Sequence, residues 1–199
     1  MVKSLQVIFM LILSVSAIAD SVSLPPTDDS YVMEFDPAYN FGSETKFVVG
    51  YQNGWVNTLI KFDLSPYAGA TINDAYIRLY VFSHGGAFPT DQIKITMNDA
   101  DWDESTVTWS NKPGFNGQIE LIAPGVNGWW DIYVTDWVQA IVDGTKPNYG
   151  FQIYKNNTDN DFFFIYSKES STNRPRLEID YTSSDLQPAT LGSIKSMFD

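Results

Sequence analysis

The sequence predicts an all-β fold, a two-sheet antiparallel sandwich of the jelly-roll type with one short helix. Short apolar runs alternate with a two-residue period, Gly, Pro, Asn and Asp punctuate between them, and a single segment has helical spacing. About eight or nine short strands of this kind are typical of a sandwich. The 199 residues include no cysteine. Packing must therefore hold the fold together without disulfides, and most aromatic rings are expected in the core.

The N-terminal residues predict a secretory signal peptide over residues 1–19. One positive charge, Lys3, precedes an almost entirely apolar run at 5–13, and Ala17-Ile18-Ala19 fits a cleavage pattern. We expect cleavage near Ala19, giving a secreted, extracellular or cell-surface protein with no membrane insertion after cleavage. An uncleaved N-terminal anchor is the alternative. Residues 20–27 are interpreted as a linker to a domain at 28–181.

The strands begin with a hairpin in which residues 46–51 and 56–64 flank Asn53-Gly54, a strong turn signal. Residues 74–83 then alternate, with Ile77 and Leu79 on one face and aromatic residues on the other. Further strands are expected at 92–98, 129–134, 149–155, 162–167 and 176–181.

The short helix is expected after the strand at 129–134. Apolar residues there recur with the spacing of one helical face, at Val134, Trp137, Val138 and Ile141. Thr135 is predicted to cap the helix and Gly144 to end it. After Tyr181 the strand pattern stops, and residues 182–199 are interpreted as a flexible C-terminal tail.

The charge balance is strongly acidic, with 24 Asp and Glu residues against 12 Lys and Arg. A nucleic-acid partner would require a basic stripe, and the sequence has none. Anionic lipid surfaces and anionic polysaccharides are disfavoured for the same reason, unless bound cations reverse the local field.

One stretch, "DADWDESTVTWSNKPG" at residues 99–114, gathers carboxylates and tryptophans. An EF-hand starting at Asp99 would need glycine at its sixth position and glutamate at its twelfth, but these are Glu104 and Ser110. A glycosidase pair needs two carboxyl groups across a cleft, which neighbours in sequence rarely provide. We favour a structural corner. Calcium ligands outside an EF-hand and catalysis by Asp101, Asp103 and Glu104 remain alternatives.

Five stretches carry a resemblance to a known family: "DSYVMEFDPAYNFGSETKFVVG", "LIKFDLSPYAGATINDAYIRLYVF", "WDESTVTWSNKPG", "WWDIYVTDWVQAIVDGTKPNYGF" and "YSKESSTNRPRLEIDY". In this order they resemble the DNRLRE or disaggregatase-related domain, also classed as carbohydrate-binding module family 96, over about residues 28–181. The resemblance implies a secreted β-sandwich module of a kind often attached to polysaccharide-degrading enzymes or other surface proteins. It also implies alginate-type binding for some members.

The same resemblance assigns a structural motif, W-x-E-x-x-x-T-W-x-N-x-P, to the 99–114 stretch. Its positions here are Trp102, Glu104, Thr108, Trp109, Asn111 and Pro113. We expect the tryptophans, Trp109 in particular, to be buried and to anchor the connection on the core. Asn111 is expected to bond the backbone of its own turn.

Three aromatic residues are candidates for ligand binding. Trp55 follows the hairpin turn, where a ring is hard to bury, although it could instead fold back over a sheet edge. Trp129 and Tyr133 share one face of their strand, opposite Trp130 and Ile132. If the second pair is core, the first is a candidate sugar platform; the alternative places it under the helix or the 99–114 stretch.

The remaining candidates are given mainly structural interpretations. Tyr76, Arg78 and Tyr80 are expected to pack, with Arg78 satisfying a buried acid such as Glu169. The single histidine, His84, is expected in an exposed loop.

No cofactor is predicted and no metal ligand set is assigned. A structural calcium ion is kept as a hypothesis, with Asp28, Asp29 and Asp63 as candidate oxygen donors.

The favoured function is a secreted, non-catalytic carbohydrate-binding module that recognises an extracellular polysaccharide by aromatic stacking and hydrogen bonds. The alternative is a structural cell-surface or extracellular-matrix protein without a sugar ligand, with other cell-surface proteins as partners. An enzyme acting on polysaccharide is a third hypothesis, because sandwich folds also host hydrolases and lyases.

Overall fold

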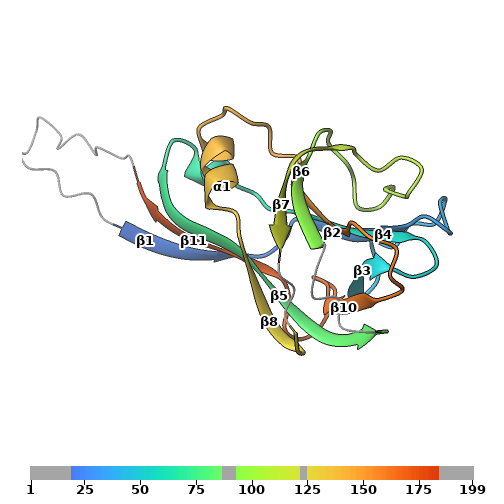
Figure 1. Cartoon of the computed structure of the whole chain (residues 1–199). Coiled ribbons are helices and arrows are strands. Elements are labelled where there is room, and N and C mark those ends of the chain that lie inside the picture. The colour runs from blue at the N-terminus through green and yellow to red at the C-terminus, as the bar shows by residue number, and fades with distance from the viewer. Residues whose placement is uncertain (1–18, 87–92, 122–124, 184–199) are drawn as a thin grey trace, which may run out of the picture.

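The computed structural model describes residues 19–86, 93–121 and 125–183 (Figure 1). These residues form an 11-stranded antiparallel sheet, one α-helix and one 3-10 helix. The elements are β1 (Ala19–Leu24), β2 (Asp28–Met33), β3 (Lys46–Tyr51), β4 (Trp55–Lys61), η1 (Ser65–Tyr67), β5 (Thr71–Gly85), β6 (Ile93–Asn98), β7 (Phe115–Leu121), β8 (Gly128–Tyr133), α1 (Thr135–Val142), β9 (Phe151–Lys155), β10 (Phe162–Tyr166) and β11 (Arg176–Thr182). The expected signal peptide, apart from Ala19, and the expected tail beyond residue 183 lie outside the described residues.

The strands follow the order β1-β11-β5-β10-β3-β4-β9-β6-β7, with β2 paired to β4 and β8 paired to β5. The long β5 strand runs from the α1 end of the molecule to β10, with β11 beside it (Figure 1). The sheet curls so that its two halves enclose one core. This is the all-β sandwich that the sequence predicts.

The core takes apolar side chains from both halves of the sheet and from α1. Those of β5 and β8 obey the predicted alternation, because Ile77, Leu79, Trp130 and Ile132 are buried. The side chains between them in sequence therefore point to the outer surface. None of the helices in the described ranges is long and apolar enough to span a membrane.

The β3–β4 hairpin forms where Asn53-Gly54 predicts it. Tyr51 pairs with Trp55, and Asn53 has a φ of 56°. Asparagine tolerates this left-handed conformation better than most residues do, so the turn chemistry and the observed backbone agree.

The helix also forms where predicted, but Thr135 has a different role. Thr135 is the first helical residue, and the N-cap is Val134, which makes no side-chain capping bond. The Thr135 hydroxyl instead donates to Asp74 Oδ1 at 3.0 Å and accepts from the Ala75 amide, fastening α1 to β5. Gly144 follows the helix with a φ of 71° and ends it as expected.

Residues 20–27 are not the linker that the sequence analysis proposes. Residues 19–24 form β1, which pairs with β11 along its whole length, from Ala19 opposite Thr182 to Leu24 opposite Leu177. Five of the six β1 residues are Ala, Asp, Ser or Val, and four are exposed, so the segment has too little apolar alternation to be recognised as a strand.

Candidate functional site

The connection between β6 and β7, residues 99–114, lies over the outer side of β2 and β4. Trp102 is its anchor: the side chain is 7% exposed, packs with Val32, Leu59 and Val107, and donates from Nε1 to the Tyr149 carbonyl at 2.9 Å. Because the connection covers this side, Leu59 is fully buried although it points away from the main core. We call residues 99–114 the covering loop.

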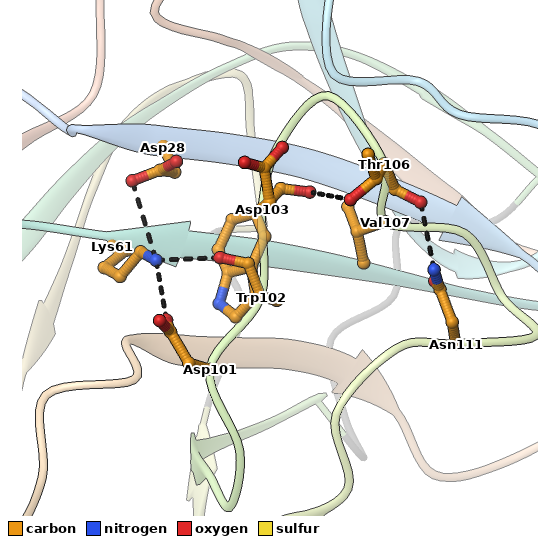
Figure 2. Close-up of a pocket in the computed structure, with 8 residues that line it drawn as sticks. All are labelled: Asp28, Lys61, Asp101, Trp102, Asp103, Thr106, Val107 and Asn111. Atoms are coloured by element: carbon orange, nitrogen blue, oxygen red, sulfur yellow. Dashed lines mark hydrogen bonds and ion pairs between the residues drawn. The ribbon is translucent and has the colours of Figure 1, made fainter.

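A polar hollow of about 500 Å³ opens beside this loop (Figure 2). Lys61 lines one side of it, with Nζ 2.9 Å from Asp101 Oδ1, 2.9 Å from the Trp102 carbonyl and 3.7 Å from Asp28 Oδ2 (Figure 2). The ammonium also lies 5.1 Å from the centre of the Trp102 ring. The positive charge of this lysine is therefore already balanced by carboxylates of the protein itself.

The other polar residues of the covering loop hold its turns. Asp103 Oδ1 accepts from the Ser105 amide at 2.8 Å and from the Ser105 hydroxyl. Asn111 Oδ1 accepts from the Thr108 amide at 2.6 Å, and its Nδ2 donates to the Thr106 carbonyl at 3.0 Å. Such side-chain to backbone bonds are typical of tight turns.

Trp109 differs from the sequence expectation of a buried anchor. Its ring is half-buried at the edge of the Trp102 cluster, and Lys112 Nζ lies 4.9 Å from its centre. Pro113, two residues before β7, is buried. The motif therefore contains one main anchor, Trp102, and one peripheral ring.

Asp101 and Asp103 of the covering loop are poorly suited to the general-acid role of a glycosidase pair. A hydrogen bond from Lys61 lowers the pKa of Asp101, and hydrogen bonds from Ser105 lower the pKa of Asp103. Both groups are ionised at neutral pH and cannot act as a general acid. Glu104 has a pKa raised by burial, but its Oε1 already accepts from Lys168 Nζ at 2.7 Å.

Glu104 belongs to a separate cluster with Asp29, Lys168 and Glu169. One carboxylate oxygen from each of the three acids lies within 4.8 Å of the others. Lys168 Nζ bonds Glu104 and Glu169, while the Lys168 amide donates to Asp29 Oδ2 at 2.7 Å. Burial raises the pKa of Asp29 to about 8.

The three oxygen donors considered for calcium from the sequence do not come together. Asp28 faces Lys61. Asp63 accepts from the Ser65 amide at 2.9 Å and from the Ser65 hydroxyl at 2.7 Å at the start of η1. Of the three, Asp29 alone belongs to the acidic cluster.

The outer surface of β5 and β8 carries the exposed aromatic residues that the strand alternation predicts. Trp129 is 45% exposed and Tyr133 is 62% exposed, whereas Trp130 and Ile132 between them are buried. Neither candidate lies under α1 or the covering loop. Large aromatic rings left in solvent on a preformed strand are suited to stacking on another molecule.

These two rings belong to a larger row, which we call the aromatic face. Its members come from β5, β8 and β10 and are Tyr76, Tyr80, Phe82, Trp129, Tyr133 and Tyr166. Tyr133 lies 5.6 Å from Tyr76, and Trp129 meets Tyr80 edge-on at 5.1 Å. The row continues through Tyr166, whose ring stacks on Phe82 at 4.4 Å.

A charged pair lies within the aromatic face, between its two exposed rings. Arg78 donates from Nε and Nη2 to the two carboxylate oxygens of Asp131, each at 2.8 Å. The guanidinium also lies 5.2 Å from the Tyr76 ring and 5.9 Å from the Trp129 ring. The prediction that Arg78 pairs with a buried acid such as Glu169 is therefore wrong. Glu169 bonds Lys168, and Arg78 lies on the outer surface.

The remaining predicted residues lie elsewhere. Trp55 is half-buried, its ring 5.1 Å from Tyr51 in an edge-on contact, so the hairpin end is only partly available to a ligand. His84 is exposed as predicted, but it lies within β5, opposite Phe163, rather than in a loop. Phe82 and Tyr166 are not among the binding residues predicted from the sequence, and Tyr76 and Tyr80 are predicted there to pack. The alternation within 74–83 and 162–167 was the signal that could have placed them outside.

Comparison with known proteins agrees with this architecture. The family model described as carbohydrate-binding module family 96 matches residues 20–181. The chain belongs to carbohydrate-binding module family 96. The matched range begins within β1 and ends within β11, so the family module and the described sandwich have nearly the same limits.

Two bacterial relatives contain a region similar to this module. Gellan lyase from Bacillus sp. is 26% identical over 184 residues, which is 89% of this chain and 7% of that protein. The tRNA nuclease WapA of Bacillus subtilis (strain 168) is 28% identical over 185 residues, 83% of this chain and 8% of that protein. The chain therefore spans less than a tenth of the length of either relative, and the similarity concerns a module within much larger proteins.

Proposed function

We propose that this chain is a secreted, non-catalytic module that binds an extracellular polysaccharide on its aromatic face. The observation that carries the proposal is the exposure of Trp129 and Tyr133 on a rigid sheet whose opposite side is core. Sugar rings present flat C–H surfaces that stack on such aromatic rings, and family membership makes a carbohydrate the preferred ligand class.

Hydrogen-bonding groups beside the rings support the same proposal. Arg78 is fixed by Asp131, so its remaining N–H groups are held in place next to Trp129. Arg176 of β11 is the strand partner of Arg78 and is exposed. The Arg78 guanidinium, flanked by Tyr76 and Trp129, and Arg176 on the neighbouring strand would bond sugar hydroxyls while the rings stack on the sugar.

We propose a neutral or weakly charged polysaccharide as the ligand. The chain has a formal net charge of −12, so it repels uronate and sulfate groups at low ionic strength. A shallow surface buries little of each sugar, and binding in the micromolar to millimolar range is expected after ordering costs are subtracted.

The test is a glycan array with the purified protein and two variants, Trp129→Ala and Tyr133→Ala. Each variant should keep the melting temperature of the parent and lose most of the binding signal. Tyr39→Ala is the matched control, because Tyr39 is 52% exposed and lies outside the aromatic face. Loss of binding in Tyr39→Ala, with Trp129→Ala unchanged, would place the ligand elsewhere.

The non-catalytic part of the proposal has its own test. Incubation of each bound polysaccharide with the protein should release neither reducing ends nor unsaturated sugars. Release of either that disappears in a Glu104→Gln variant would instead support catalysis in the covering loop.

A further inference from the structure

Three segments far apart in sequence bring carboxylates together beneath the covering loop. Asp29 comes from β2, Glu104 from the covering loop, and Glu169 from the segment after β10. One oxygen from each lies within 4.8 Å of the others. Asp29 and Glu104 are further linked, because the Asp29 amide donates to Glu104 Oε1 at 3.2 Å.

Two carboxylate oxygens of this cluster have no hydrogen-bond partner among the described residues. They are Asp29 Oδ1 and Glu169 Oε2, and both are buried. Asp29 as a whole is only 1% exposed. A buried acceptor without a donor is unfavourable, and native proteins usually satisfy such an atom with a protein group, a water molecule or an ion.

The local charge is also incompletely balanced. Lys168 supplies one ammonium group for three carboxylates, and its Nζ bonds Glu104 and Glu169. Asp29 receives only the backbone amide of Lys168. With all three acids ionised, as calcium binding would require, two negative charges remain beyond Lys168, and one divalent ion would match them.

We propose that Asp29, Glu104 and Glu169 bind one calcium ion. Carboxylate oxygens in an irregular arrangement suit calcium, which accepts six to eight oxygen ligands with flexible geometry, better than magnesium, which demands a near-ideal octahedron. Zinc is disfavoured because the cluster contains neither histidine nor cysteine. Backbone carbonyls and water would complete the coordination.

In this site Lys168 competes with calcium, since its ammonium group bonds two of the three ligands. The ion would join the covering loop to β2 and to the segment after β10, adding a cross-link to a protein that has no disulfide. The inference does not depend on the proposed function, because none of the three acids belongs to the aromatic face.

The site is tested by isothermal titration calorimetry of the chelator-treated protein with calcium chloride. We expect one equivalent of calcium to bind, more tightly than magnesium. At about 100 times the dissociation constant, calcium should raise the melting temperature by roughly 5–10 °C. Glu169→Gln and Glu104→Gln should each weaken binding at least about tenfold, a loss that removal of even an outer-shell group can cause.

Lys168→Met is the most discriminating variant, because removal of the competing ammonium group should strengthen calcium binding. Asp180→Asn is the control, because Asp180 is an exposed carboxylate on β11 outside the cluster. The proposal is overturned if neither the parent nor the folded Lys168→Met variant binds calcium. It is equally overturned if calcium binds but Glu169→Gln and Asp180→Asn respond alike, which would indicate diffuse binding to an acidic surface.

Discussion

Two tryptophans of one motif, Trp102 and Trp109, occupy different environments in the covering loop. Trp102 is buried and bonds the Tyr149 carbonyl, whereas Trp109 is half-buried with Lys112 over its ring. The spacing of a motif identifies an anchored loop, but it does not say which ring enters the core. That depends on where the loop turns, and Asp103 and Asn111 set those turns.

Trp102→Ala should lower the free energy of unfolding by about 3–5 kcal/mol, the usual cost of deleting a large buried aromatic side chain. Trp109→Ala should cost less than half as much, because its ring keeps a solvent-exposed side. Guanidinium chloride unfolding of both variants measures the difference. Equal losses for the two would contradict the assignment of Trp102 as the main anchor.

A buried ion pair between Lys155 and Asp161 gives a second prediction at the residue scale. The Lys155 side chain is fully buried, and its Nζ bonds Asp161 and the Asp159 carbonyl at 2.9 Å. Asp161→Asn would leave a buried ammonium without its counter-charge and should cost about 3–5 kcal/mol. The double variant Lys155→Met/Asp161→Asn should recover part of that loss in the same unfolding measurement. A double variant less stable than Asp161→Asn would show that the lysine is held by other groups.

At the scale of elements, β1 completes the edge beyond β11. Val22 and Leu24 of β1 pack partly against the core, and Ser23 Oγ donates to Glu178 Oε1 at 3.0 Å. The strand is mostly polar because one side faces solvent and the other covers only the end of the core. β1 therefore stabilises the sheet mainly through its backbone pairing with β11. Backbone pairing produces no apolar alternation that could be recognised in the sequence.

A chain that begins at Pro25 should still fold but melt several degrees below one that begins at Ala19, because β11 becomes an unprotected edge. Differential scanning calorimetry of the two proteins measures this. The comparison should use one buffer and one protein concentration, since an exposed β11 edge also favours association. Identical melting temperatures would restore the linker interpretation of residues 20–27.

β5 and β8, which the sequence predicts, differ from β7, which it does not predict, in how regularly their residues alternate between two faces. β5 and β8 bury one face and expose the other, so their alternation predicts both the core and the aromatic face. β7 contains Gly117 with a φ of 73°, and the β6–β7 register shifts between Ile95 and Met97. An irregular strand of this kind leaves no two-residue period in the sequence.

The partners of charged side chains were less predictable than the strands, because they depend on register between strands far apart in sequence. Arg78 contacts Asp131 because the register of the β5–β8 pairing places the two residues directly opposite each other. The Asp29, Glu104 and Glu169 cluster likewise requires the covering loop to lie on β2. Neither arrangement follows from local sequence patterns.

At the scale of the whole molecule, the curled sheet separates two surfaces. The covering loop buries one side of β2 and β4, and its carboxylates serve structure. Among the described residues, none covers Trp129 and Tyr133 on the outer side of β5 and β8 in this way, and both rings remain exposed. Under the proposed function, the covered surface contributes stability and the aromatic face binds the ligand.

The net charge of −12 acts on any ligand that approaches the molecule. Binding of a uronate polymer should strengthen as sodium chloride rises from about 10 mM to 150 mM, because screening shortens the range of repulsion from roughly 30 Å to 8 Å. Binding of a neutral polymer should change little. Affinity electrophoresis at several salt concentrations compares the two. Tight, calcium-independent binding of alginate at low salt would mean that Arg78 and Arg176 outweigh the overall charge.

The central claim, that the aromatic face binds the sugar, is tested most directly by nuclear magnetic resonance with an oligosaccharide of the bound polymer. The six tryptophan indole N–H groups report separate positions on the molecule. Addition of the oligosaccharide should shift the Trp129 signal and the amides of β5 and β8, while the Trp102 signal stays in place. Largest shifts at Trp102, Trp109 or Trp55, with Trp129 unaffected, would contradict the account.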